Sequence, residues 1–98
     1  MDRSNVYLNF EITEEELVGY EPVDAFNLGI DFMVGIFALR DALHSGQTDV
    51  SHKIFEDNVV RFRKVLDDNG LRGTLLRCGD PHKGEKVRYS ITLDYSEN

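Results

Sequence analysis

The chain has 98 residues, and its 18 acidic against 11 basic side chains give a formal net charge of −7. This length predicts one domain, residues 1–98, and a content of 41% hydrophobic and 30% charged residues excludes a disordered chain. Cys78 is the only cysteine, which excludes an internal disulfide. The first residues lack the apolar core of a secretory signal, so we expect a cytoplasmic protein.

The first predicted element is a strand over residues 5–12, where apolar and polar side chains alternate. Its apolar face carries Val6, Leu8, Phe10 and Ile12. Thr13 is followed three residues later by Glu16, which is the spacing of a capping box. This spacing predicts a short helical turn directly after the strand.

The second predicted element is a helix over Val23–Leu43 that is apolar nearly all the way round. Its large side chains cover roughly 240° of the helix surface, whereas an ordinary surface helix is apolar along one stripe. A chain of this length has little material to surround such a helix, so we expect a partner, most simply a second copy. A membrane span is not expected, because the uninterrupted apolar run covers only Phe32–Leu39 and a span needs about 20 residues.

A narrow stripe of polar and small side chains interrupts this apolar surface, within about 80° of the helix circumference. The stripe contains Asp24, Asn27, Asp31, Gly35, Ala38 and Ala42. Small residues let two backbones approach closely. We therefore predict a homodimer interface made by Asp31, Gly35, Ala38 and Ala42, the alternative being that the stripe faces water.

The third predicted element is an amphipathic helix over Val50–Asp68. Its apolar side chains fall within about 140°, and charged side chains occupy the other side. Asn58 lies within the apolar stripe, and a buried Asn requires hydrogen-bond partners. Partners in the nearby backbone are the simpler expectation, and a role in fixing the register of an interface is the alternative.

The last predicted element is a hairpin, with arms over Leu71–Cys78 and Val87–Leu93 and a loop rich in Gly, Asp and Pro between them. Residues 95–98 are expected to be a frayed tail. The predicted order is β-α-α-β-β. This order indicates a small α+β domain in which two helices pack on one face of a three-stranded antiparallel or mixed sheet.

Acidic side chains concentrate near the beginning of the chain, and residues 1–31 carry the whole net charge. The candidate partner-binding residues are Glu14, Glu15, Glu16, Glu21 and Asp24. We expect them to face a basic surface of another protein, as in small inhibitors, immunity proteins and phage-encoded antagonists of host defence. The alternative is a well-solvated helix start.

A second hypothesis comes from residues 48–93, where a basic helix precedes a hairpin with a basic tip. This layout resembles that of winged helix-turn-helix proteins, which implies a DNA-binding regulator whose hairpin contacts the DNA backbone. The residues that the resemblance assigns to DNA are Arg77, Lys83, Lys86 and Arg88. A winged helix usually has three helices before the hairpin, and this sequence predicts two.

No residue pattern indicates an enzyme, a metal or a cofactor. Cys78, Asp80 and His82 alternate, but they lack the paired ligand spacing of a zinc site. Nucleophilic catalysis by Cys78 needs a base and an orienting group that the sequence does not place. A third hypothesis, a small-molecule sensor with a pocket between sheet and helices, has no residue signature.

Overall fold

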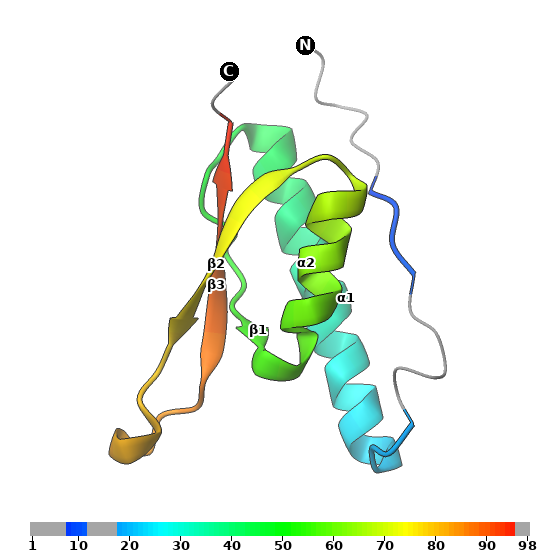
Figure 1. The fold of residues 1–98 in the computed structure, drawn as a ribbon, viewed down its shortest axis with the longest axis vertical. Coiled ribbons are helices and arrows are strands. Elements are labelled where there is room, and N and C mark those ends of the chain that lie inside the picture. Colours follow the sequence, from blue (N-terminus) through cyan, green and yellow to red (C-terminus); the bar gives the residue numbers. More distant parts are fainter. Residues whose placement is uncertain (1–7, 12–17, 96–98) are drawn as a thin grey trace.

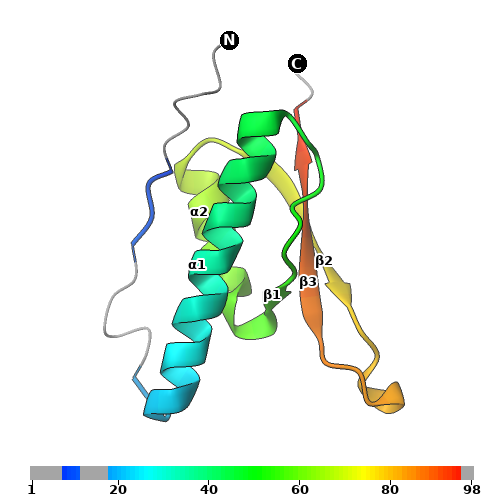
Figure 2. The same ribbon diagram turned by 180° about the vertical axis from the view of Figure 1, so that it is seen from behind.

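The computed structural model describes residues 8–11 and 18–95, which form a small α+β domain (Figure 1). The elements are α1 (Pro22–Ser45), β1 (Ile54–Phe55), a 3₁₀ turn η2 (Glu56–Asn58), α2 (Val59–Asp68), β2 (Arg72–Cys78), a 3₁₀ turn η3 (Pro81–Lys83) and β3 (Arg88–Asp94). The strands form an antiparallel sheet in the order β1-β3-β2, and both helices cover one of its faces (Figures 1 and 2). The predicted fold class is confirmed.

The first strand of the sheet is not at the predicted place. Residues 8–11 have no regular secondary structure, and the rest of the predicted strand lies outside the described residues, as does the turn predicted after it. Phe10 instead packs edge to face on Phe32 of α1, with ring centroids 5.6 Å apart. Asn9 and Asn69 exchange hydrogen bonds of 2.9 and 2.8 Å. Of the predicted apolar face, the structure describes Leu8, which packs against the core, and Phe10, which contacts a helix rather than a strand.

The segment predicted to begin the second helix supplies the missing strand. Ile54 and Phe55 pair with Tyr89 and Arg88 of β3, and α2 begins only at Val59. Upstream of β1 the chain already runs beside β3, because the Val50 N–H donates to Ile91 O at 3.0 Å. Sheet hydrogen bonds therefore outweigh the helical periodicity of this segment, and the observed order of elements is α-β-α-β-β.

Helix α1 is two residues longer at its carboxyl end than predicted. It begins at Pro22 and ends at Ser45, and the following Gly46 is its C-cap, with a left-handed φ of 71°. Such a conformation suits glycine and closes the helix through hydrogen bonds from the Gly46 N–H to the last carbonyl groups.

The small-residue stripe of α1 packs inside the subunit, which corrects the predicted dimer interface. Asp31, Gly35, Ala38 and Ala42 are all buried by other parts of the same chain. A Cβ added to Gly35 would lie 2.5 Å from Cζ of Phe62 and 3.1 Å from Cγ2 of Ile54. The small residues do permit a close approach, as expected, but the approaching elements are α2 and β1.

The core lies between the helices and the sheet. Its largest fully buried side chains are Phe32, Leu39, Ile54, Asn58, Phe62, Leu66 and Ile91. Tyr95, placed in the predicted frayed tail, is held by a 2.7 Å hydrogen bond from its hydroxyl to Gln47 O, and residues 96–98 lie outside the described part. Helix α1 is long and apolar enough to cross a membrane, and 39% of its most apolar stretch is buried inside the fold.

Candidate functional site

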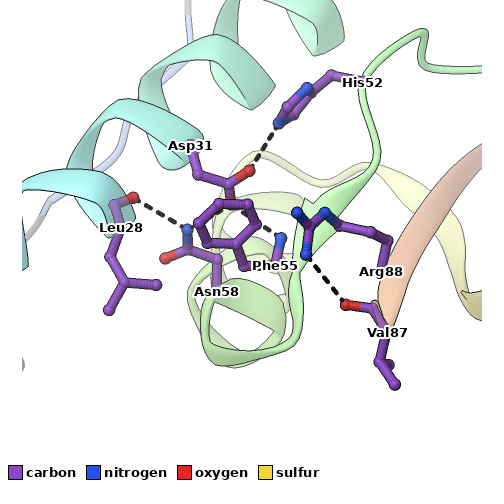
Figure 3. A network of polar contacts seen from close by, with 7 residues as sticks. All are labelled: Leu28, Asp31, His52, Phe55, Asn58, Val87 and Arg88. Atoms are coloured by element: carbon purple, nitrogen blue, oxygen red, sulfur yellow. Dashed lines mark hydrogen bonds and ion pairs between the residues drawn. The ribbon is translucent and has the colours of Figure 1, made fainter. Parts of the chain in front are cut away.

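A buried carboxylate joins α1 to the segment that leads into α2 (Figure 3). The Asp31 side chain is 2% exposed, and its Oδ2 accepts hydrogen bonds from the Phe55 N–H at 2.8 Å and from Asn58 Nδ2 at 2.7 Å. Its Oδ1 lies 2.7 Å from Nε2 of His52. A carboxylate only accepts hydrogen bonds, so the His52 ring nitrogen is the donor. With three hydrogen-bond donors around it, this buried carboxylate has hydrogen-bond partners for both oxygens, which offset the cost of its burial.

Asn58 extends this network to both helices. Besides Asp31, its Nδ2 donates to the carbonyl of Leu28 at 3.0 Å, and its Oδ1 accepts from Arg61 at 3.0 Å. The expected backbone partner of this buried Asn is present. The network therefore fixes the turn between β1 and α2 against the middle of α1.

A hollow of about 500 Å³ opens at the surface above this network, between α1 and the segment after β1. Its lining combines apolar side chains with six polar or charged ones: Tyr20, Asp24, Asn27, His52, Asp57 and Lys86. Two exposed carboxylates, Asp24 and Asp57, thus share the lining with one ammonium group, while the Asp31 carboxylate is buried beneath them. The described lining residues therefore supply hydrogen-bond acceptors and negative charge, which suit a positively charged group of a binding partner.

Tyr20 and Asp57 close one side of the hollow. The Tyr20 hydroxyl donates to Asp57 Oδ2 at 3.1 Å. This hydrogen bond raises the pKa of Tyr20 above its ordinary value of 10.0, and the charge of Asp57 acts in the same direction. The hydroxyl therefore stays protonated and keeps Asp57 at the rim.

An exposed apolar face of α1 adjoins the hollow. The side chains that make this apolar face are Val23, Phe26, Ile30, Val34 and Phe37, between 43% and 68% exposed. Ile30 and Val34 line the hollow as well, so the acidic rim and the apolar face form one continuous surface. Contiguous exposed apolar side chains rimmed by polar groups are typical of interaction sites.

The structure places one of the predicted partner-binding acids at the hollow. Asp24 lines the hollow, and Glu21 is exposed directly before α1. Glu14, Glu15 and Glu16 lie outside the described residues. Sequence reasoning missed Tyr20, His52 and Asp57, because only the fold brings residues this far apart in the chain to one hollow.

The four residues assigned to DNA do not act as one group. The Arg88 guanidinium lies 4.3 Å above the Phe55 ring centroid and donates to Val87 O at 3.4 Å, so it packs against β1 (Figure 3). Lys86 lines the acidic hollow, while Arg77 and Lys83 are exposed. Residues 8–11 and 18–95 contain two α-helices rather than the three of a usual winged helix.

The alternating residues at the hairpin have local structural roles. Asp80 Oδ1 accepts from the His82 N–H at 2.9 Å, which caps η3, and Cys78 Sγ lies 3.5 Å from Leu76 O. In the described part of the chain no group of three or more His, Cys, Asp or Glu side chains could hold a metal ion. Comparisons with known protein families, with characterised proteins and with solved structures return no match.

Proposed function

We propose that this protein is a small acidic module that binds a basic surface of another protein and blocks it, as an inhibitor or antagonist does. The observation that carries this proposal is the continuity of the acidic hollow with the apolar face of α1 through Ile30 and Val34. Protein interfaces combine an apolar centre with a polar rim, and charge complementarity at the rim sets the rate and specificity of association.

The chemistry of the surface favours a basic partner. A lysine or arginine side chain fits the hollow, where Asp24 and Asp57 supply charge and Tyr20 supplies an aromatic ring. Apolar side chains of the partner beside that cation pack on Phe26 and Phe37, which are 68% and 55% exposed. Such binding needs no chemical step. It inhibits by covering a surface that the partner uses for another ligand.

The test begins with capture of protein partners by the tagged chain from the cells that produce it. Dissociation constants are then measured for the captured protein with the parent chain and its variants. Phe26→Ser is expected to weaken binding about 30-fold, since a central aromatic anchor is worth about 2 kcal/mol or more. Asp24→Asn is expected to weaken it about threefold at low salt and less at high salt.

Asp41→Asn is the matched control, because Asp41 is also exposed on α1 but does not line the hollow. Thermal unfolding of each variant tests whether it is folded. A partner that binds the Phe26→Ser and Asp24→Asn variants as tightly as the parent would contradict the proposal. Co-purifying nucleic acid whose binding requires Arg77 and Lys83 would instead support the DNA-binding hypothesis.

A further inference from the structure

Residues 8–11 lie beside the C-terminal end of α2 (Figures 1 and 2). This segment has no regular secondary structure. Leu8 and Phe10 nevertheless pack inward, Leu8 against the core and Phe10 on the buried ring of Phe32. Asn9, between them, is exposed. Inward and outward residues alternate in this way along an extended chain, so the segment lies on the domain as an extended peptide would.

The backbone of Asn9 is held by a single side-chain amide at the end of α2. The Asn9 N–H donates to Oδ1 of Asn69 at 2.9 Å, and Nδ2 of Asn69 donates to Asn9 O at 2.8 Å. One residue thus makes both of its backbone hydrogen bonds to one partner, as in a hydrogen-bonded pair of an antiparallel sheet. We call these two bonds the Asn69 clamp. Because both go to backbone atoms, the clamp recognises a peptide backbone whatever the side chain at that position.

The Asn69 clamp is oriented by the fold and not by the segment that it holds. The second N–H of Asn69 Nδ2 donates to Val65 O at 2.7 Å, and the Asn69 backbone N–H donates to the same carbonyl at 3.1 Å. These bonds fix the amide at the end of α2 and leave Oδ1 and one N–H for a ligand backbone. A group that is already oriented binds at a smaller entropic cost, which is the advantage of a preorganised site.

The apolar contact of the segment is made on a ring that the core already confines. The Phe10 ring centroid is 5.6 Å from that of Phe32, which packs in turn on the buried Phe62 at 5.1 Å. Phe10 itself stays 42% exposed, so its ring lies on the core and not within it. None of the described residues 8–11 belongs to the sheet. These are the contacts of a ligand on a formed surface.

We propose that the Asn69 clamp and Phe32 form a peptide-binding groove, whose resident ligand is residues 8–11 and which also takes a partner peptide of the same chemistry. That chemistry is an extended backbone with a large aliphatic side chain before the clamped residue and an aromatic one after it. Main-chain hydrogen bonds supply affinity in such recognition, and contacts of alternate side chains supply specificity. The resident segment is then a built-in competitor, because a partner peptide binds only after displacing it. Neither Asn69 nor Phe32 lines the acidic hollow, so this groove is a separate site.

The probe for this groove is a fluorescent synthetic peptide with the sequence of residues 5–12, added to the full chain. We expect weak binding to the parent, because the tethered segment competes at a high effective concentration. Phe10→Ala in the chain weakens the resident segment and is expected to tighten binding of the peptide about tenfold. Fluorescence anisotropy gives the dissociation constants, and thermal unfolding tests whether the variant is folded. A folded Phe10→Ala chain that binds the peptide no better than the parent would overturn the proposal.

Two modified peptides test the Asn69 clamp without any change in the protein. Methylation of the backbone nitrogen at the Asn9 position removes the N–H that donates to Asn69, and is expected to weaken binding about tenfold. An Asn9→Ser peptide keeps this N–H and is the matched control, with an expected affinity equal to that of the unmodified peptide. Equal affinity of the methylated peptide would refute recognition through the clamp.

Hydrogen exchange of the parent chain measures displacement directly. The Asn9 amide is expected to be protected in the free chain and to exchange faster when unlabelled peptide is added in excess. The Leu71 amide, which donates to Leu66 O at the same end of α2, is the internal control and should stay protected. Unchanged exchange at Asn9 in saturating peptide would contradict the proposal. A chain that sediments as a dimer and dissociates on addition of peptide would place the segment on a second copy, which would also contradict it.

Discussion

At the scale of single residues, Asp31 is the side chain on which most polar contacts of the site depend. Its carboxylate satisfies donors from His52, Phe55 and Asn58, which belong to a segment more than twenty residues away in the chain. A buried donor without an acceptor costs about 1–3 kcal/mol. The three donors therefore hold the turn before α2 in place only while this carboxylate is present.

We expect Asp31→Ala to lower the free energy of unfolding by about 3 kcal/mol, because it leaves the Phe55 N–H and one of the two N–H groups of the Asn58 amide without an acceptor. Asp31→Asn keeps one acceptor and is expected to be about half as harmful. Urea denaturation followed by circular dichroism gives both values. Asp24→Ala, at an exposed position on the same helix, serves as the control. Equal stability of the parent and the Asp31→Ala variant would show that the network does not stabilise the fold.

At the scale of elements, α1 has one glycine at a packed contact and another in open space. Gly35 faces the buried Phe62 ring, which is itself confined by Phe32 with ring centroids 5.1 Å apart. Nothing lies within 4 Å of a Cβ added to Gly29. Replacing each glycine by alanine therefore separates the effect of helix propensity on stability, at Gly29, from the effect of packing, at Gly35.

Gly29→Ala is expected to raise the free energy of unfolding by about 0.5–1 kcal/mol, the gain in helix propensity. Gly35→Ala is expected to lower it by about 1–3 kcal/mol, because the added methyl overpacks the contact with Phe62. Chemical denaturation of the parent and the two variants measures these free energies of unfolding. A stabilising Gly35→Ala substitution would mean that α1 and α2 are packed less tightly than the structure shows.

At the scale of the whole molecule, the proposed partner surface lies at one edge of the sheet. Its hollow is lined by Phe55 of β1, which is at one end of the strand order β1-β3-β2, whereas β2 is at the other end (Figures 1 and 2). Substitutions at exposed positions of β2 should therefore leave the partner surface intact.

Leu76 of β2 offers a matched test, because it is also an exposed apolar side chain but lines neither the hollow nor the apolar face of α1. Leu76→Ser should leave the dissociation constant for the partner unchanged, whereas Phe26→Ser weakens binding. Calorimetric titration measures this constant. A loss of affinity in the Leu76→Ser variant would instead extend the partner contact to β2.

Much of this fold was predictable from local patterns. The long apolar helix, the amphipathic α2 and the hairpin each carry their own periodicity, and the turn residues between them mark most boundaries. The strand at Ile54–Phe55 was not predictable, because two residues are too few to show alternation and the flanking sequence has helical spacing. The dimer prediction for Gly35 was wrong for a related reason: a stripe of small residues predicts a close contact but not which element makes it.

Local sequence patterns were enough to predict the fold class, the long apolar helix α1 and the acidic residue in its first turn, because periodicity and charge patterns involve residues that are near in the chain. The packing of the elements was needed to show that Asp31 contacts His52 and Asn58, that Asp24 and Asp57 line one hollow, and that β2 is at the edge of the sheet. Those contacts join residues far apart in the chain. They depend on how whole elements pack, which a local pattern does not specify.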